Sequence, residues 1–425
     1  MHDVSAILSQ KGNAFLADVI GGLSGAQKTL PCRWLYDKLG SDLFEAITGL
    51  EAYYPTRAET EILRVHSPEI AAFAGDGPVL VEYGAGAGVK TSLMLAALNS
   101  PRGYVPIDIA GEYLAQTVEK IASRFPALWV RPVAADFLSV FDLPAGVPAG
   151  QRIGFFPGST IGNLDETEAT AFLTQMHRHV GARGGAIIGV DLLKDVSTLV
   201  RAYDDPAGVT AQFNLNLLAR INRELGGDFR LECFRHEARW NDVDRSVEMH
   251  LVSVREQWVS VGEVRFHFEQ GETIHTESSR KYDLDGFTSL AAGAGWDVVE
   301  TWLDAKGQFC VFALRPSNEG ASHQFFTGRA RKQLTQASKH GDLSRSVHLP
   351  ANLPTKLSCM SALVGSSPRQ VGTAREASGQ VALDAPLNRL GAFADPPCVD
   401  LENDGLDRRA LGVVHPECVI VLSGV

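Results

Sequence analysis

Several features are scarce in this chain of 425 residues, and each absence excludes a class of protein. The six cysteines are scattered singly without a Cys-x-x-Cys pair, so we expect neither a metal site nor a redox motif. The sequence has no run of about 18 apolar residues, the length that a bilayer-spanning helix requires. Its first ten residues include Asp3 and lack the apolar core of a secretory signal. We therefore expect a cytoplasmic protein without a membrane partner.

Basic residues are also fewer than acidic ones. The 39 Lys and Arg residues are outnumbered by 50 Asp and Glu residues, which gives a formal net charge of −11. Proteins that hold nucleic acid or anionic lipid by electrostatic attraction are usually basic, so neither is an expected partner. Hydrophobic residues make up 45% of the chain and charged residues 21%, which is typical of a globular protein. The length allows two or three domain-sized units, and a monomer is the default expectation.

The first half of the chain contains a repeated alternation of apolar strands and helical segments. The expected strands are 79–84, 104–109, 129–137, 153–159 and 185–193, and the expected helices are 61–74, 90–98, 111–124 and 165–180. Strands that alternate with helices at this spacing predict βαβ units and a parallel sheet.

The pattern changes after the fifth strand. An amphipathic helix comes first, then strands whose alternation predicts antiparallel pairing, and finally a helix and a hairpin. These segments are 209–225 for the first helix, 246–254 and 263–271 for strands, 287–294 for the last helix, and 296–304 with 307–316 for the hairpin.

The sequence therefore predicts an α/β fold, a Rossmann-like domain with an insertion after its fifth strand. The insertion and the N-terminal segment are expected to form a second α+β lobe, because neither alone could bury its apolar face. The predicted parts are 1–57 (N-terminal part of the second lobe), 58–193 (Rossmann-like domain), 194–283 (inserted lobe), 284–316 (end of the Rossmann-like domain) and 317–425. The last part is rich in Ser, Gly, Pro and Asn and is predicted to be a disordered tail.

A glycine-rich loop follows the first strand and opens a helix. Glycine lets the chain turn tightly and lets a ligand approach the backbone. Val89 stands where both the P-loop and the dinucleotide fingerprint require glycine, so both of those motifs fail. The spacing Glu-x-Gly-x-Gly-x-Gly from Glu82 to Gly88 instead fits the first motif of class I methyltransferases, which use S-adenosylmethionine.

Residues at the ends of the next strands support a nucleoside site. Asp108 could accept hydrogen bonds from both ribose hydroxyls, although NAD enzymes use an acidic residue in the same way. Asp136 could accept a hydrogen bond from an adenine amino group, and Phe137 could pack on the base. The alternative for Asp136 is a helix cap, and the alternative for Phe137 is a core aromatic. Lys90 could pair with the carboxylate of the methionyl part, and its alternative is a solvated lysine.

Five motifs carry a resemblance to one family. They are Gly158–Asn163, Tyr36-Asp37 with Gly40-Ser41, and the segments 53–57, 201–205 and 276–279. Together, over about residues 5–316, the chain resembles the histidine Nα-methyltransferases of ergothioneine biosynthesis. The resemblance implies that methyl groups pass from S-adenosylmethionine to the α-amino group of free histidine, three times, to give the betaine hercynine. Residues after 316 have no counterpart in that family.

The resemblance also implies a role for each matching residue. Cofactor contacts would come from Gly84, Lys90, Asp108, Asp136 and Phe137. Substrate contacts would come from Asn163 and Tyr203 at the carboxylate, Tyr36 and the backbone of Gly158 beside the amine, Glu277 and Ser279 at the imidazole, Tyr53 on the other side of the ring through water, and Met249 along the ring pocket.

These roles agree with the chemistry of a free amino acid, whose carboxylate, amine and side chain must all be fixed. Glu277 can accept from an imidazole N–H, and a ligand without that N–H would leave the buried carboxylate unpaired. Tyr36 can accept a hydrogen bond from the amine or help its proton to leave.

Ordinary structural roles compete with several of these assignments. A glutamate on a strand is usually solvated, and Met249, Tyr54 and Phe44 would by default be core residues. His177 and His179 stand two apart on a predicted helix and are interpreted as surface residues.

Three other functions remain as alternatives. The nearest is methylation of another amine, such as tryptophan, whose apolar ring has no use for a buried carboxylate. A non-catalytic binding protein could keep the fold but would have no need of Lys90, Asp108 or Asn163. Methylation of nucleic acid is disfavoured by the acidic charge.

Overall fold

The computed structural model describes residues 4–86, 88–109 and 111–317, with side chains described within these ranges from residue 14 onward except that of Glu112. Apart from its first residue, the tail predicted for 317–425 lies outside the described residues. Within the described part of the chain, no helix is long and apolar enough to cross a membrane.

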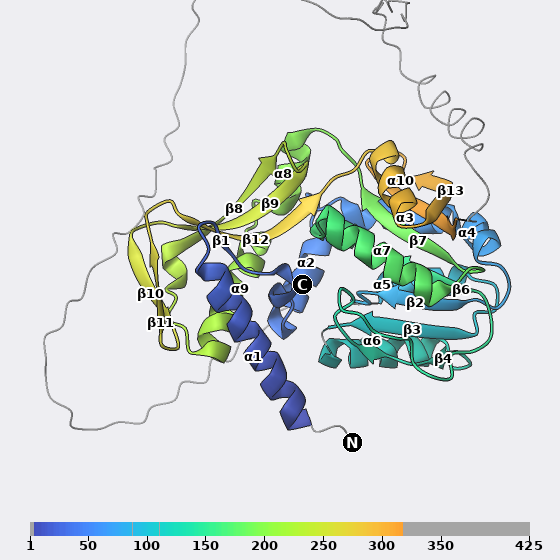
Figure 1. The fold of residues 1–425 in the computed structure, drawn as a ribbon. Coiled ribbons are helices and arrows are strands. Elements are labelled where there is room, and N and C mark those ends of the chain that lie inside the picture. The colour runs from blue at the N-terminus through green and yellow to red at the C-terminus, as the bar shows by residue number, and fades with distance from the viewer. Residues whose placement is uncertain (1–3, 87, 110, 318–425) are drawn as a thin grey trace, which may run out of the picture. The chain divides into compact units, whose positions relative to one another are not determined.

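The larger of the sheets is a mostly parallel one (Figure 1). Its strands are β2 (Val79–Tyr83), β3 (Gly103–Asp108), β4 (Trp129–Val130), β5 (Val133–Ala134), β6 (Arg152–Phe156), β7 (Gly185–Asp191), β13 (Trp296–Leu303) and β14 (Phe309–Pro316). Their order is β13-β14-β7-β6-β2-β3-β4, with β5 also paired to β3. Strand β14 runs antiparallel to β7, so the expected closing hairpin completes the sheet. The predicted parallel α/β fold is confirmed.

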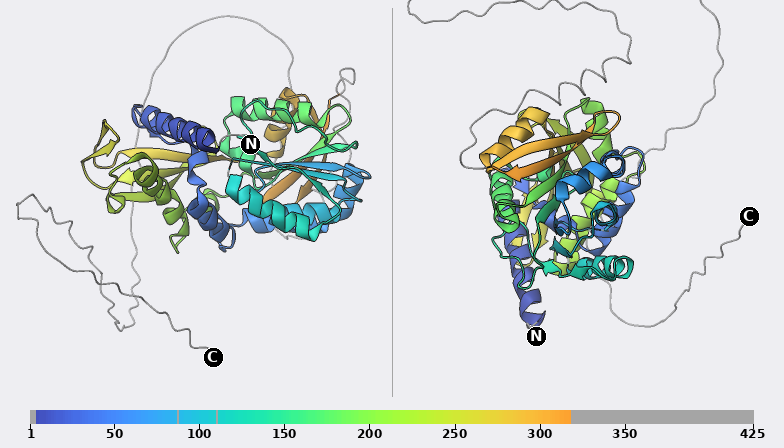
Figure 2. Two further views of the ribbon diagram at one scale, coloured as in Figure 1. Left: turned by 90° about the horizontal axis from the view of Figure 1, so that it is seen from below. Right: turned by 90° about the vertical axis from the view of Figure 1, so that its right-hand side faces the viewer.

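Helices cover both faces of this sheet, as Figure 2 shows. One face is covered by α3 (Pro55–Val65), α4 (Ser67–Ala74), α5 (Val89–Ala97) and α6 (Gly111–Arg124). The other is covered by α7 (Glu166–Val180) and α10 (Leu284–Gly293). The sheet is therefore buried on both sides, which explains why β2 and β7 are apolar along nearly their whole length.

Some predicted boundaries are wrong for identifiable reasons. The helix expected at 61–74 begins earlier, at Pro55, because proline is well suited to the first turn. Its interruption at His66 lies just before Pro68, where the restriction that proline places on the preceding residue predicts one. The strand expected at 129–137 is reduced to the two short strands β4 and β5.

The second sheet has the order β1-β12-β9-β8 and is accompanied by the hairpin β10-β11. Its strands are β1 (Lys28–Thr29), β8 (Phe234–Asn241), β9 (Ser246–Ser253) and β12 (Thr273–Arg280), and the hairpin is β10 (Gln257–Val261) with β11 (Val264–Phe268). Four helices and two short 3-10 helices belong to the same part: α1 (Val4–Leu23), α2 (Lys38–Thr48), α8 (Val196–Tyr203), α9 (Val209–Leu225), η1 (Cys32–Leu35) and η3 (Leu231–Cys233). A third 3-10 helix, η2 (Thr160–Asn163), follows β6.

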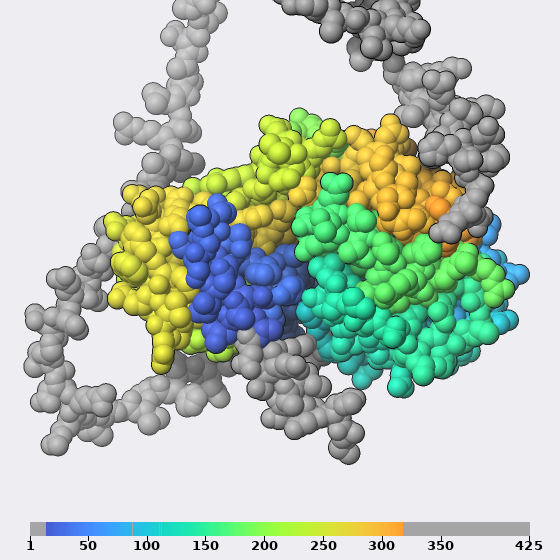
Figure 3. Space-filling model, in the orientation of Figure 1, coloured from blue at the N-terminus to red at the C-terminus, as the bar shows by residue number. Residues whose placement is uncertain are grey.

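One apolar core joins the N-terminal segment to the segment between β7 and α10. It contains buried side chains from residues 15–54 and from residues 199–274. Figure 3 shows the N-terminal segment (blue) on the surface beside the hairpin β10-β11 (yellow). The two segments lie far apart in sequence, yet each supplies part of the same buried surface.

The interpretation of His179 as a surface residue is wrong. Its side chain is buried, with Nδ1 2.9 Å from Tyr83 Oη and Nε2 2.9 Å from the carbonyl oxygen of Phe141. Phe172, Met176 and His179 are spaced four and three residues apart, so they share the face of α7 that meets the sheet.

Candidate active site

The glycine-rich loop leads from β2 into α5. Gly84, Gly86 and Gly88 have φ values of +73°, +49° and +76°, a region that side chains disfavour. A Cβ on Gly84 would meet no heavy atom within 4 Å, so open space lies beside the backbone there. The loop therefore has the shape and the free approach that a nucleoside-bearing cofactor needs, and α5 begins directly after it.

A buried carboxylate holds this loop in place. Glu82, on β2, accepts hydrogen bonds from Thr91 Oγ1 at 2.7 and 3.0 Å and from the hydroxyl of Tyr104. The contact joins β2, β3 and α5. Burial raises the pKa of Glu82 to about 8.

Lys90 lies against Glu59 of α3. Its Nζ is 2.6 Å from Glu59 Oε2, and the side chain of Glu59 is almost completely buried. The same carboxylate accepts from the backbone N–H of Gly158 at 2.9 and 3.1 Å. A Cβ on Gly189 would come within 2.0 Å of Glu59 Oε1, so glycine is needed there to make room. Glu59 thus joins Lys90 to the turn that carries Gly158.

The other proposed cofactor residues lie at the ends of β3 and β5. Asp108 Oδ2 accepts from the backbone N–H of Gly86 at 3.3 Å, so this carboxylate reaches the glycine loop. Asp136 accepts from the N–H of Leu138 at 2.9 Å. Phe137 is half-buried and packs against Phe156 and Phe172, with ring centroids 5.4 Å apart in both pairs. The core contact considered for Phe137 is present, whereas Asp136 is followed by a turn rather than a helix, so its contact with Leu138 is not a helix cap.

The segment from Gly158 to Asn163 is a tight turn followed by η2. Gly158 and Ser159 have positive φ values of +84° and +59°, and Ser159 Oγ accepts from the backbone N–H of Asp191 at 2.9 Å. A Cβ on Gly162 would lie 2.6 Å from the carbonyl oxygen of Arg280. Glycine therefore permits η2 to pack directly on the end of β12, which places half-buried Asn163 beside that strand.

A β-bulge sets the direction of the side chains on β12. His275 pairs with His250 and Glu277 with Met249, so Thr276 is the extra residue. Side chains alternate along a strand, and the extra residue reverses which face each one meets. After the bulge, Glu277 and Ser279 share the buried face, and Lys281 continues it just beyond the strand. Met249, directly opposite Glu277, belongs to that face too.

A buried lysine connects two of the predicted substrate residues. Lys281 Nζ lies 2.9 Å from Tyr203 Oη and 2.7 Å from Ser279 Oγ, and these two oxygens are 2.7 Å apart. Its charge is paired with Asp191 at the end of β7, where Nζ is 2.9 Å from Oδ2. The side chains of Lys281 and Asp191 are both fully buried.

Asp191 has two further partners. Tyr54 Oη donates to its oxygens at 2.7 and 2.8 Å, and Lys194 Nζ approaches Oδ1 at 2.5 Å. Tyr54 is therefore buried as the default interpretation held, but its hydroxyl belongs to a polar network that joins α3, β7 and β12. One carboxylate balances two lysines at this point.

Two tyrosines flank the buried face of β12. Tyr36, just after η1, packs edge-on against Phe44 and Phe213 with ring centroids 5.6 and 5.5 Å away. Tyr53 packs edge-on against Tyr203 at 6.0 Å. Burial raises the pKa of both phenols well above the usual value, and the charge of Glu277 adds to the effect. Both hydroxyls therefore stay protonated near neutral pH.

Local contacts explain why these tyrosines belong to longer motifs. Arg57 donates to the carbonyl oxygens of Leu50, Glu51 and Tyr53, which fixes the turn before α3. Asp37 caps α2 by accepting from the N–H of Gly40. A Cβ on Gly40 would lie 1.8 Å from the carbonyl oxygen of Leu35, so only glycine permits this turn.

Glu277 is the most exceptional group at the site. Its side chain is only 8% exposed, and Oε2 has no hydrogen-bond partner. Burial raises its pKa to about 7, and the charge of Lys281 acts in the opposite direction. A buried carboxylate oxygen without a donor is costly, and a ligand that brings an N–H would relieve that cost.

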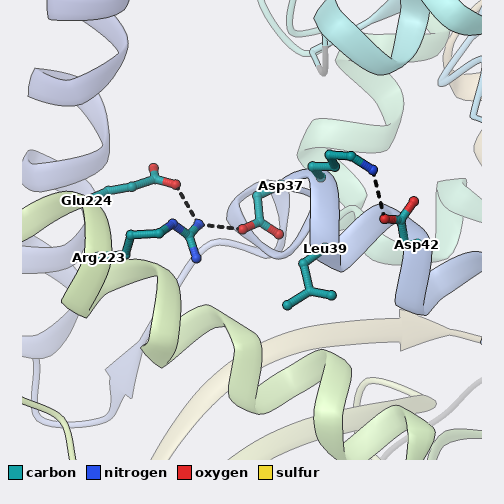
Figure 4. Close-up of a pocket in the computed structure, with 6 residues that line it drawn as sticks. Asp37, Leu39, Asp42, Arg223 and Glu224 are labelled. Atoms are coloured by element: carbon teal, nitrogen blue, oxygen red, sulfur yellow. Dashed lines mark hydrogen bonds and ion pairs between the residues drawn. The ribbon is translucent and has the colours of Figure 1, made fainter. Parts of the chain in front are cut away.

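A surface hollow of about 360 Å³ opens beside Asp37 (Figure 4). Its charged side chains are already paired with one another: Arg223 with Asp37 and Glu224, and Lys38 with Asp42. It does not include Glu277, Ser279 or Tyr203. We assign this hollow a structural role, because the contact of Arg223 with Asp37 holds the start of α2 against the end of α9.

Sequence reasoning missed Glu59, Asp191, Lys194 and Lys281. Asp191 had a usable signal, because it is a charged residue at the carboxyl end of an otherwise apolar parallel strand, where ligand sites collect. Lys281 stands two positions beyond Ser279, as Ser279 does beyond Glu277, so strand alternation could have grouped all three.

The sheet order, the closing antiparallel hairpin and the glycine loop after the first parallel strand define a class I S-adenosylmethionine-dependent methyltransferase. The sequence model of the family described as "Histidine-specific methyltransferase, SAM-dependent" matches residues 15–316. The chain belongs to this family.

Individual relatives agree with that membership. The chain is 42% identical over 302 residues to a histidine N-alpha-methyltransferase of Mycobacterium tuberculosis, covering 70% of this chain and 93% of the relative. It is 40% identical over 301 residues to the enzyme of the same name from Mycolicibacterium smegmatis, covering 70% and 93%. An L-tryptophan methyltransferase of Psilocybe serbica is 26% identical over 330 residues, covering 68% and 89%.

Replacing Lys90 with methionine is expected to lower both stability and affinity for S-adenosylmethionine. The free energy of unfolding should fall by about 3 kcal/mol, because buried Glu59 loses the cation that balances it. The double variant Lys90→Met with Glu59→Gln should regain most of this stability. Its affinity for S-adenosylmethionine should stay on the order of tenfold below that of the original protein. Thermal unfolding and calorimetric titration measure the two effects. Recovery of cofactor affinity in the double variant would show that Lys90 acts only on Glu59.

Proposed function

We propose that this enzyme transfers methyl groups from S-adenosylmethionine to the α-amino nitrogen of free L-histidine, giving trimethylhistidine for ergothioneine biosynthesis. The observation that carries the proposal is the orphaned Oε2 of buried Glu277, opposite Met249 and near Ser279. An imidazole N–H supplies the missing donor, and a thioether suits the ring face. The names of the two mycobacterial relatives support the same substrate.

In this proposal, the chain's own residues orient the amino acid. Asn163 and the hydroxyl of Tyr203 donate to its carboxylate, and Glu277 and Ser279 bind its ring, with Tyr53 on the other side through water. The phenol of Tyr36 and the backbone of Gly158 lie beside the amine. Fixing three groups of a small substrate aligns the amine for an in-line attack, which is the main source of rate in such a transfer.

Cofactor binding is assigned to Gly84, Lys90, Asp108, Asp136 and Phe137. S-Adenosylmethionine, when bound, supplies a methyl group on a positively charged sulfur. The α-amino group would have to be neutral to accept that methyl group. Because burial raises its pKa, Tyr36 is a neutral phenol, whose oxygen can accept a hydrogen bond from the amine N–H but cannot retain a proton from the amine, so that proton passes to solvent.

Tryptophan is the rival substrate, and the relative from Psilocybe serbica shows that the wider group includes a tryptophan methyltransferase. An indole could offer its single N–H to Glu277 but would bring no second polar group for Ser279. A larger apolar ring would also leave the remaining polar atoms of Ser279 and of the Glu277 carboxylate without partners in a buried site, which is unfavourable. Histidine fits these groups better.

The test is mass spectrometry of purified full-length protein incubated with S-adenosylmethionine and either histidine or tryptophan. We expect products one, two and three methylene units heavier from histidine, with the last accumulating. The variant Glu277→Ala should lower kcat/KM for histidine roughly 100-fold, since it removes a hydrogen bond to a charged group.

Glu248→Ala is the matched control. Glu248 lies in the same sheet but pairs with Ser278, so it belongs to the opposite face. This variant should keep the activity of the original protein. Methylation of tryptophan and not of histidine would overturn the substrate assignment and leave the class of enzyme unchanged.

A further inference from the structure

Lys281 uses its entire hydrogen-bonding capacity within the protein. An ammonium group has three N–H donors. Three acceptors surround Nζ: Asp191 Oδ2 at 2.9 Å, Tyr203 Oη at 2.9 Å and Ser279 Oγ at 2.7 Å. The lysine therefore has no donor left for a substrate, and its role must be exercised through the two hydroxyl groups.

The ammonium holds those two hydroxyl oxygens together. Tyr203 Oη and Ser279 Oγ are 2.7 Å apart, a separation at which one hydroxyl hydrogen must lie between them. The pair has two hydrogens in total, so one remains for the substrate. Without the lysine, the oxygens could separate and each hydroxyl could turn independently.

A substrate carboxylate decides which hydroxyl keeps that remaining hydrogen. Carboxylates only accept, so Tyr203 must donate to the carboxylate that the proposed function places beside it. Ser279 then donates to Tyr203. Its oxygen accepts from Lys281 and has one lone pair left, which faces the substrate ring as an acceptor.

The ring is thereby placed between two acceptors, Ser279 Oγ and the carboxylate of Glu277. An imidazole satisfies both only when each of its nitrogens carries a hydrogen, which is the cationic form. On the basis of the proposed function, we infer that Lys281 is a positioning residue that fixes Ser279 as an acceptor, so that the site selects the imidazolium form of its substrate.

The surrounding charges agree with a cationic ring. Burial raises the pKa of Glu277 to about 7, and a cation beside it would favour its ionised form. Burial raises the pKa of four neighbouring groups, and the charge of Glu277 raises it further. They are the thiol of Cys32 and the phenols of Tyr36, Tyr53 and Tyr203. These groups are therefore uncharged near neutral pH. Lys281 Nζ lies against Asp191, and Oε2 of Glu277 has no partner among the residues that the structure describes, so that oxygen is available to the ring.

The experiment compares histidine with 2-fluorohistidine, whose ring is nearly the same size but too weakly basic to be protonated near neutral pH. Calorimetric titration of the full chain, saturated with S-adenosylhomocysteine, should show histidine binding ten- to a hundredfold more tightly, roughly the value of a hydrogen bond to a charged group. 2-Methylhistidine, which is basic but larger at the same carbon, controls for size.

A matched pair of variants assigns this selectivity to Lys281. Lys281→Met should reduce the preference for histidine over 2-fluorohistidine to less than about fivefold, because Ser279 becomes free to donate. Lys194→Met removes the other lysine of Asp191, which touches neither hydroxyl, and should retain the full preference.

The outcomes separate this inference from the proposed function. If histidine is methylated but 2-fluorohistidine binds equally well to the original protein, the selection of the cationic ring is wrong and the function stands. If both lysine variants lose the preference equally, Lys281 is only a structural residue. If histidine neither binds nor reacts, the proposed function itself fails.

Discussion

Replacing Glu277 with glutamine should stabilise the folded protein while weakening its affinity for histidine. The pKa of Glu277 is about 7 in the fold and near 4.5 when unfolded, so the folded state binds more protons between these values. Stability from this group therefore falls as pH rises from about 4.5 to 7, and the full cost is present above 7. The shift corresponds to about 3 kcal/mol, and glutamine relieves up to that amount.

Thermal unfolding at about pH 5 and about pH 8, which lie on either side of most of that shift, measures how the stabilisation depends on pH. The stabilisation by Glu277→Gln should be small at the lower pH and large at the higher one, whereas calorimetric titration at the higher pH should show histidine binding weakened by roughly ten- to a hundredfold. Glu272→Gln is the control, because the pKa of Glu272 is lowered, in part by its contact with Lys28. That variant should lose stability at the higher pH. A Glu277→Gln protein that is less stable at the higher pH would contradict the cost assigned to this carboxylate.

Replacing Asp191 with asparagine should be among the most destabilising single changes in the chain. It leaves Lys281, fully buried, and Lys194, only 11% exposed, without their shared counter-charge. Removing one partner of a buried ion pair typically costs about 3–5 kcal/mol, roughly 5–8 °C in Tm for a protein of this size. Histidine affinity should fall as well, since Lys281 would no longer hold Tyr203 and Ser279 in place.

Thermal and urea unfolding check this second prediction. The double variant Asp191→Asn with Lys281→Met should recover part of the lost stability, because one of the two unbalanced charges is removed. Tyr54→Phe, which removes a neutral hydroxyl that donates to Asp191 and accepts from Lys194, should cost about 1 kcal/mol. A loss below about 1 kcal/mol in Asp191→Asn would show that the lysines are balanced elsewhere.

The fold could be predicted largely from the sequence because its signals are local. Apolar runs alternate with helical periodicity, and the glycines from Gly84 to Gly88 need particular backbone angles whatever the rest of the chain does. The closing hairpin was predicted within two residues of its observed bounds. Short strands such as β4 and β5 have too few residues for any period to be visible.

The substrate residues followed from resemblance and not from pattern. Alternation puts Glu277, Ser279 and Lys281 on one face, but a bulge at Thr276 decides which face that is, and bulges leave no mark in hydrophobic periodicity. Glu59 and Lys90 come from different helices, and their contact depends on how both pack on one sheet. Such long-range pairings are set by tertiary structure, so a single sequence could not reveal them.

The extra residue at Thr276 also constrains how this site can change in evolution. Loss of that one codon would restore regular alternation and send Glu277, Ser279 and Lys281 to the opposite face, with Ser278 and Arg280 taking their places. Point substitutions can alter these positions one at a time, but a single-residue deletion would exchange all of them together. New substrates in this lineage are therefore reached by substitution on a fixed frame, and the length of this strand should vary far less than its composition.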